Sequence, residues 1–273
     1  MRARNRGLVA GGFIVCFFAF AGLAAPLVAP YDPHEIHLEE GLGRPSHAHP
    51  LGQDTLGRDV LSRVLYGARI SMWVGTVTVA VSLSIGTFLG FLAGYYGGIL
   101  EEIVMRAVDI LLAFPGILLA IAMTSVLGPS VNNVILALCI VGWVGYARLV
   151  RAQVLSVRHA DYVQAARALG AGDLRICARH ILPNILAPVV VEATFGLAGA
   201  ILGEAGLSFL GLGTQPPTPS WGTMLNEGRQ FLLVAPHLTL APGIAIMTAV
   251  LGLNFLGDGL RDRLDVKGRA FAG

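Results

Sequence analysis

The sequence predicts an all-α membrane protein with six transmembrane helices. Its 273 residues are 55% hydrophobic and only 13% charged, with a mean hydropathy of +0.69, whereas a soluble domain carries about 25% charged residues. Six apolar stretches are interpreted as spanning helices, since a helix needs about 20 residues to cross the hydrocarbon core. The arginines are distributed unevenly among the segments between these stretches, as expected when a chain crosses a membrane repeatedly.

The first apolar stretch, 8–28, follows Arg2, Arg4 and Arg6. It is longer than the apolar region of about 7–15 residues in a signal peptide, so residues 1–30 are expected to form an uncleaved anchor helix. The remaining spans are expected at 70–95, 104–127, 134–147, 185–202 and 238–256.

Two of the spans contain small or helix-breaking residues. Gly86, Gly90 and Gly94 recur every four residues in the second span, and this spacing favours close contact with another helix. Pro115, within the sequence FPG, interrupts the third span and permits a kink. The kink can serve gating or only packing, and Pro115 is a candidate for lining a pathway.

Two long segments are expected to be extracytoplasmic. Residues 31–69 mix Pro, His, Gly and acidic residues, and residues 207–237 contain Pro216, Pro217 and Pro219. These prolines forbid a continuous helix. Irregular backbone persists at a membrane face only where it is wet or buried in protein.

Counting basic residues gives the expected orientation. With the N-terminus in the cytoplasm, the inner segments receive fourteen Arg and Lys residues and the outer segments receive five. Both termini, the tail 259–273 and an arginine-rich segment at 148–184 are therefore expected to be cytoplasmic. The five outer residues are Arg44, Arg58, Arg63, Arg69 and Arg229.

The arginine-rich segment is patterned as two short helices. Asp161 is expected to cap the first helix, with Gln164 in the capping-box position. Gly170 suits the left-handed position that ends a helix. Asp173 is expected to cap the second helix, and Pro183 to close the unit. The apolar face of the first helix consists of Tyr162, Ala165, Ala166 and Leu169.

Two interpretations of this segment follow from its pattern. Its first helix is about two turns long, which is too short to be stable alone in water. A small-faced helix suits insertion into a groove on a protein partner. The alternative is a helix that lies on the lipid surface with its arginines against phosphates.

Composition excludes several kinds of function. Lys267 is the only lysine and precedes Gly268, so a phosphate-binding loop of the form G-x-x-x-x-G-K-[ST] cannot exist in this sequence. A net charge of +2 does not indicate nucleic-acid binding. Cys16, Cys139 and Cys177 have neither disulfide nor metal-ligand spacing. We therefore expect no catalytic residue and no cofactor site in this chain, and we do not expect an enzyme.

The arginine-rich segment is similar to a known transporter motif. Gln164-Ala165-Ala166, Gly170 and Ile181-Leu182-Pro183 resemble the EAA…G…I-LP loop of bacterial ABC importer permeases, with Gln164 where many members carry Glu. Three further stretches resemble the C-type permease of dipeptide, oligopeptide and nickel importers. They are HPLGQDTLGRDVLSRVLYGARIS (49–71), GEAGLSFLGLGTQPPTPSWGTML (203–225) and NFLGDGLRDRLD (254–265).

This resemblance implies a type I ABC importer permease fold with its core at 70–258, located in the bacterial inner membrane. It implies four kinds of partner: a related B-type permease, two ABC ATPase subunits, an external solute-binding protein and the lipid bilayer. ATP and Mg²⁺ would be bound by the ATPases, and the implied function is ATP-coupled import of peptides or nickel. The coupling residues would be Asp161, Tyr162, Gln164, Ala165, Ala166, Leu169, Gly170, Asp173 and Pro183.

Three acidic residues in or near the spans are candidates for lining the pathway. Asp109 is three residues from Arg106, so an ion pair between them is the alternative. Glu192 lies well inside the fifth span, where it either lines the pathway or is a hydrogen-bonded structural group. Glu204 lies near the outer mouth, where it can attract the amino terminus of a peptide or pair with the outer loop.

The outer segment contains several histidines among acidic residues. Imidazole and carboxylate groups can bind a transition metal, but their spacing matches no closed site. We therefore expect a solvated face and predict no metal site. The histidines are His34, His37, His47 and His49.

Two other functions are alternatives. A secondary transporter or channel driven by an ion gradient predicts clustered midplane ionisable groups and inverted repeats, whereas the sequence shows one mid-helix acid, Glu192, and no evident repeat. A membrane scaffold explains the cytoplasmic helix but not the Pro-rich outer segment.

Overall fold

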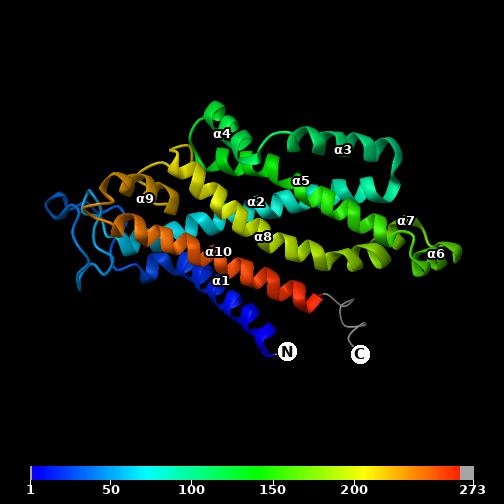
Figure 1. The fold of residues 1–273 in the computed structure, drawn as a ribbon, viewed down its shortest axis with the longest axis horizontal. Coiled ribbons are helices and arrows are strands. Elements are labelled where there is room, and N and C mark those ends of the chain that lie inside the picture. The colour runs from blue at the N-terminus through cyan, green and yellow to red at the C-terminus, as the bar shows by residue number, and fades with distance from the viewer. Residues whose placement is uncertain (1, 265–273) are drawn as a thin grey trace.

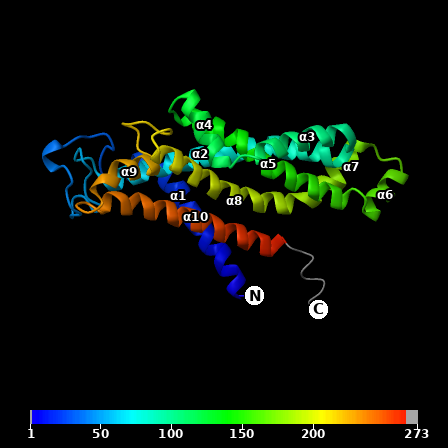
Figure 2. The ribbon, with the colours of Figure 1, turned by 45° about the horizontal axis from the view of Figure 1, so that its top comes forward.

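The computed structural model describes residues 2–264, which contain helices and no extended β-strand. Figures 1 and 2 show an elongated bundle with α6 at one end and, at the other, α9 and the irregular segment 29–59. Lys267, Arg269 and most of the predicted 259–273 tail lie outside the described residues. The helices are α1 (Arg2–Val28), α2 (Val60–Tyr96), α3 (Gly98–Leu112), α4 (Gly116–Leu127), α5 (Val131–Val157), α6 (Asp161–Ala168), α7 (Asp173–Ile176), α8 (Leu182–Phe209), α9 (Trp221–Gly228) and α10 (His237–Leu264), with short helical turns at Leu38–Glu40 and Arg229–Phe231 and a π-helical turn at Cys177–Ile181.

The predicted all-α fold is confirmed, with five helices that qualify as spans and a sixth candidate, the predicted third span, that is broken. In the described range, α1, α2, α5, α10 and the continuous helix Asp173–Phe209 are each long and apolar enough to cross a membrane. The pair α3 and α4 forms the sixth candidate span and bends by 84°. Pro115 lies at the N-cap of α4, where its missing N–H and its restraint on Phe114 interrupt the helix.

Helices α2 and α5 are longer than their predicted spans. α2 begins at Val60, so the predicted outer segment 31–69 is irregular only as far as its N-cap residue, Asp59. The Asp59 carboxylate accepts hydrogen bonds from the Ser62 backbone N–H at 2.7 Å and from the Ser62 hydroxyl at 2.8 Å. These bonds satisfy donors that the first helical turn leaves unpaired.

The close contact predicted from the glycine spacing is the packing of α2 on α5. A Cβ atom on Gly86 would lie 2.5 Å from the Trp143 carbonyl oxygen, and one on Gly90 would overlap the Ala147 carbonyl. Gly94 faces Val154 at 2.9 Å in the same way. All three glycines are buried, so the two backbones approach each other along the length of the crossing.

The first and last helices of the bundle, α1 and α10, also pack backbone to backbone. A Cβ atom on Gly11 would overlap the Leu256 amide, and one on Gly259 would lie 2.7 Å from Leu8 Cα. Both views show α1 beside α10, with the start of α1 and the end of α10 directed toward the α6 end of the bundle. The two described ends of the chain therefore lie on the same side as α6.

Candidate functional site

The first helix of the arginine-rich segment is α6, and its capping differs from the prediction. Ala160 is the N-cap residue and makes no side-chain hydrogen bond, so the prediction that Asp161 is the cap was wrong. Asp161 lies in the first turn instead, where its negative charge interacts favourably with the positive end of the helix dipole. Gln164 Nε2 donates to the His159 carbonyl at 2.8 Å, which ties the helix to the preceding turn.

Two faces of α6 have different environments. Val163 is fully buried and packs, together with Ala166, in the cluster that contains Ile176 and Val154. Sequence reasoning missed Val163, and of the four residues in the predicted apolar face only Ala166 packs in this cluster. The other three are open: Ala165 is exposed, Tyr162 is 45% exposed and Leu169 is 89% exposed.

The turn after α6 and the start of α7 extend this open apolar surface. Gly170 has φ +80°, as predicted for the residue that ends the helix, and nothing lies within 4 Å of its hypothetical Cβ atom. Leu174 is 85% exposed. We call Tyr162, Ala165, Leu169 and Leu174 the α6–α7 apolar surface. It lies at the tip of the bundle, beyond the ends of α2 and α8 (Figure 1).

The second helix of the segment is fixed to α2. The Tyr95 hydroxyl donates to Asp173 Oδ1 at 2.5 Å, and Arg167 Nη2 donates to the Tyr95 oxygen at 3.3 Å. Gly172, rather than Asp173, is the N-cap residue. Pro183 was predicted to close the unit, which was wrong: it lies where the π-helical turn Cys177–Ile181 passes into α8, inside the continuous helix Asp173–Phe209.

The bundle contains a second feature, a concavity of about 320 Å³ between α2, α4, α5 and α8. Six glycines line it, together with apolar residues and four polar ones: Thr78, Ser82, Tyr146 and Glu192. The hydroxyl groups of the first three are buried and have no hydrogen-bond partner within the described part of the chain. We call these four polar residues and the surrounding space the mid-bundle concavity.

The other three pathway candidates lie outside this lining. Asp109 is exposed on α3, and Arg106 pairs with Glu102 at 3.8 Å, so the proposed pair of Asp109 with Arg106 was wrong. Pro115 is exposed at the bend, next to Gly116, which does line the concavity.

Glu204 is a structural group. Its side chain is buried and accepts hydrogen bonds from Ser208 at 2.7 Å, Ser71 at 3.0 Å and Thr214 at 3.4 Å. These hydroxyls come from α8, α2 and the segment after α8. Glu204 therefore connects three parts of the chain, as the pairing alternative anticipated.

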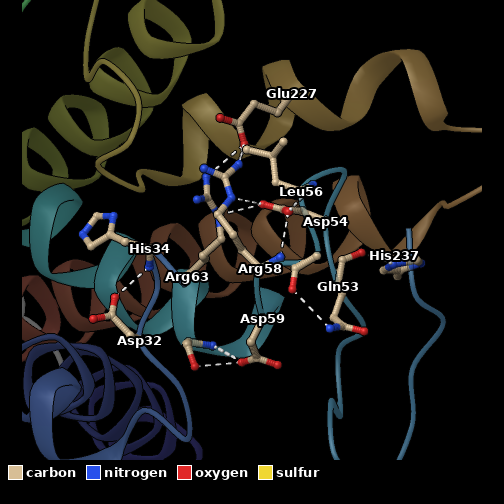
Figure 3. A network of polar contacts seen from close by, with 12 residues as sticks. Asp32, His34, Gln53, Asp54, Leu56, Arg58, Asp59, Arg63, Glu227 and His237 are labelled. Atoms are coloured by element: carbon tan, nitrogen blue, oxygen red, sulfur yellow. Dashed lines mark hydrogen bonds and ion pairs between the residues drawn. The ribbon is translucent and has the colours of Figure 1, made fainter. Parts of the chain in front are cut away.

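The α9 end of the bundle is held by a largely buried network of four charged residues (Figure 3). Arg58 Nε donates to Asp54 at 2.6 Å, and Arg58 Nη2 donates to Glu227 of α9 at 3.1 Å. Arg63 Nη2 donates to Glu227 at 2.9 Å, and its Nε lies 3.4 Å from Asp54. Both arginines were counted as outer flanking charges, but the structure buries them against carboxylates from two segments distant in sequence.

One residue of the histidine-rich segment, His49, contacts the N-cap residue of α2. His49 Nδ1 lies 2.9 Å from Asp59 Oδ1, and the His49 ring stacks on Tyr31 at 4.6 Å. His37 Nε2 lies 3.3 Å from Glu35. Within residues 2–264, no group of three or more His, Cys, Asp or Glu side chains is arranged to hold a metal ion.

Two protein-family models match this chain, and together they cover most of its length. Residues 86–269 match the family described as "Binding-protein-dependent transport system inner membrane component". The chain belongs to this family. Residues 3–45 also match the "N-terminal TM domain of oligopeptide transport permease C". Family members are membrane permease subunits of bacterial ABC importers in the inner membrane and are not enzymes. The resemblance stated from the sequence is therefore confirmed. Neither alternative function, an ion-gradient transporter or a scaffold, is needed to explain the sequence.

Several curated permeases match along nearly their whole length. The chain is 46% identical over 264 residues to "Dipeptide transport system permease protein DppC" of Alkalihalophilus pseudofirmus, covering 97% of this chain and 87% of that protein. It is 46% identical over 268 residues to "Glutathione transport system permease protein GsiD" of Pectobacterium atrosepticum, covering 97% and 88%. It is 45% identical over 271 residues to "Di/tripeptide transport system permease protein DppC" of Pseudomonas aeruginosa, covering 97% and 89%.

A solved structure shows the same permease fold. The chain aligns with a chain of the MetNI methionine ABC transporter in an inward-facing conformation, with a TM-score of 0.61 and 20% identity. The alignment covers 75% of this chain and 97% of the other. The predicted type I importer permease fold is thereby confirmed.

Of the four polar residues in the mid-bundle concavity, sequence reasoning named Glu192 and missed the other three, and it also missed the anchor Tyr95. Thr78 and Ser82 are four residues apart in an apolar helix and therefore share a face, a signal that could have indicated a polar lining. Tyr146 and Tyr95 carry no comparable signal, because their neighbours in space come from distant parts of the sequence.

Proposed function

We propose that this chain is the permease subunit of an ABC importer for short peptides, paired with a second permease and driven by two ATPase subunits. The similar proteins named above transport dipeptides, di- and tripeptides or glutathione, and all of these are short peptides. Peptide cargo is therefore favoured over nickel. An external binding protein would deliver the peptide, and ATP and Mg²⁺ would be held by the ATPase subunits.

The α6–α7 apolar surface carries the proposal for coupling. Leu169 and Leu174 are almost fully exposed at the tip of the bundle, beside the glycine turn at Gly170. Large apolar side chains at such a tip favour insertion into a groove on a protein partner. With this end in the cytoplasm, the partner is the ATPase, and Val163 and Tyr95 connect the docked helix to the bundle.

Transport follows from movement of this docked segment. When the ATPases close around ATP, they would displace α6, and the hydrogen bond between Asp173 and Tyr95 would pass the displacement to α2. α7 continues through the π-helical turn into α8, one wall of the mid-bundle concavity. The same displacement thus reaches two of the helices that line the concavity.

Bulky residues on the α6–α7 apolar surface are expected to uncouple the permease. We expect Ala165→Trp and Gly170→Val to weaken ATPase docking by about 2 kcal/mol or more, roughly thirtyfold in affinity. The measurements are ATP-dependent peptide uptake in proteoliposomes and retention of the ATPase subunits on the tagged permease.

Gly98→Val is the matched control for Gly170→Val. Gly98 has φ +62° and open space around its hypothetical Cβ atom, as Gly170 has, but it is the first residue of α3. The same backbone strain is introduced there without touching the α6–α7 apolar surface. Full uptake and unchanged ATPase retention in the Ala165 and Gly170 variants would contradict the proposal.

Tyr95→Phe is expected to reduce coupling while the ATPase stays bound. The substitution removes the hydrogen bond to Asp173 but leaves the ring in place, and a hydrogen bond to a charged group contributes about 1.5–3 kcal/mol. We expect uptake per ATP hydrolysed to fall roughly threefold or more. Tyr96→Phe is the control, since Tyr96 is adjacent and 60% exposed; equal uptake-to-hydrolysis ratios in the two variants would exclude a role for Tyr95 in transmission.

A further inference from the structure

The mid-bundle concavity combines depth in the bundle with polar groups. Glu192 lies near the middle of the 37-residue helix Asp173–Phe209. Thr78 and Ser82 are in the central part of α2, and Tyr146 is in the central part of α5. In a helix long enough to cross a bilayer, these positions fall at the depth of the hydrocarbon core. Polar side chains are costly to place there, and those that occur are usually functional.

Three of these groups lack the hydrogen bonds that their burial requires. Thr78 is 4% exposed, Ser82 is 1% exposed and Tyr146 is 5% exposed, yet Thr78 Oγ1, Ser82 Oγ and the Tyr146 hydroxyl have no partner within the described residues. Leaving a buried polar group without a hydrogen-bond partner is destabilising. Three such groups in one concavity indicate that a polar ligand or water supplies the missing bonds.

The charge of the lining selects the ligand. Glu192 is the one acidic residue of the lining, and no Arg, Lys or His belongs to it. The Tyr146 hydroxyl of α5 packs against Gly196 of α8, one helical turn after Glu192, so Tyr146 and Glu192 line neighbouring parts of the concavity. A lone carboxylate with nearby hydroxyls is complementary to an ammonium group, which has three donors and no acceptor.

The size of the concavity and its glycines allow more than a single ion to enter. A volume of about 320 Å³ lies at the lower end of the range of roughly 300–1,000 Å³ for small-molecule pockets. Gly145 and Gly199 line it, and a Cβ atom on either would have nothing within 4 Å. The space beside these two glycines is therefore open to a short peptide backbone.

We infer that the mid-bundle concavity is a transient site for a peptide in transit, with Glu192 as the counter-ion of the peptide's amino-terminal ammonium group. The hydroxyls of Thr78, Ser82 and Tyr146 would hydrogen-bond the ammonium and the first peptide unit. This inference rests on the proposed function, and it assigns to this chain a recognition step separate from that of the binding protein.

The test measures binding to the assembled transporter in nanodiscs without the binding protein. Saturation-transfer NMR detects weak ligands, and the two probes are Ala-Ala and N-acetyl-Ala-Ala, which differ in the ammonium group. We expect Ala-Ala to bind and the acetylated probe to bind at least about tenfold more weakly, since a charge-assisted hydrogen bond is lost. Glu192→Gln is expected to weaken Ala-Ala by a similar factor and to remove the difference between the probes.

Controls distinguish a failure of this inference from a folding defect of a variant and from a failure of the proposed function. Glu102→Gln removes an exposed carboxylate on α3 and is expected to change neither probe. Equal binding of the two probes to the wild-type complex, or no binding of either, overturns the inference even when Glu192→Gln does not assemble. Wild-type proteoliposomes that take up no peptide with the binding protein present would instead overturn the proposed function.

Discussion

Replacing Arg63 with Met is expected to lower the free energy of unfolding by about 3–5 kcal/mol, because the change leaves one negative charge of the network without a balancing positive charge. Arg63 is 1% exposed and contacts both Glu227 and Asp54. Without it, Arg58 alone would balance two carboxylates. The measurement is thermal denaturation of the purified permease complex, with the amount of assembled complex as a second readout.

The double variant Arg63→Met with Glu227→Gln distinguishes lost charge balance from lost packing. It keeps the buried pair of Arg58 with Asp54 at 2.6 Å and removes one charge of each sign. Since a buried charge without a partner costs more than a neutral replacement of the pair, we expect the double variant to recover much of the lost stability. A double variant less stable than Arg63→Met would show that the ion pairs are not the source of the effect.

Gly90→Leu is expected to prevent assembly of the permease. A Cβ atom at this position would overlap the carbonyl of Ala147 on α5, and backbone cannot move aside as a flexible side chain can. Overpacking of a close-packed interior costs about 1–3 kcal/mol or more, and the contact between α2 and α5 extends over Gly86, Gly90 and Gly94. The yield of monodisperse complex after size-exclusion chromatography is the measurement.

Gly12→Leu is the matched control for this prediction. Gly12 is a partly exposed glycine of α1, and nothing lies within 4 Å of its hypothetical Cβ atom. We expect a yield close to that of the wild type, since a side chain there overlaps no other part of the described chain. A similar loss in both variants would attribute the effect to replacing glycine in a helix rather than to the crossing of α2 and α5.

The positions of the spans could be predicted because they depend on local composition. The apolar stretches at 8–28 and 238–256 lie within α1 and α10, and Gly170 has the predicted left-handed conformation. The start of α2 could not be predicted, because Arg63 resembles a residue outside the membrane until Glu227, more than 160 residues later, is placed beside it. The angle at Pro115 also depends on packing that the local sequence does not contain.

The coupling segment was predicted as a unit, but not its orientation on the bundle. Tyr162 and Leu169 were predicted to share the apolar face, and they do, yet the buried residue is Val163. A two-turn helix with apolar residues on two sides does not indicate which side contacts its own chain. Ile176 and Val154 decide this through the cluster that they form with Val163.

The pairing of α1 with α10 has a consequence for biosynthesis. At about 5–20 residues per second, the ribosome needs roughly ten to fifty seconds to make the chain between Gly11 and Gly252, whose helices interlock. During that interval the face of α1 that packs on α10 has no α10 to cover it. A chain truncated by a premature stop codon before His237 would leave that face uncovered permanently, giving membrane quality-control proteases a surface absent from the finished permease.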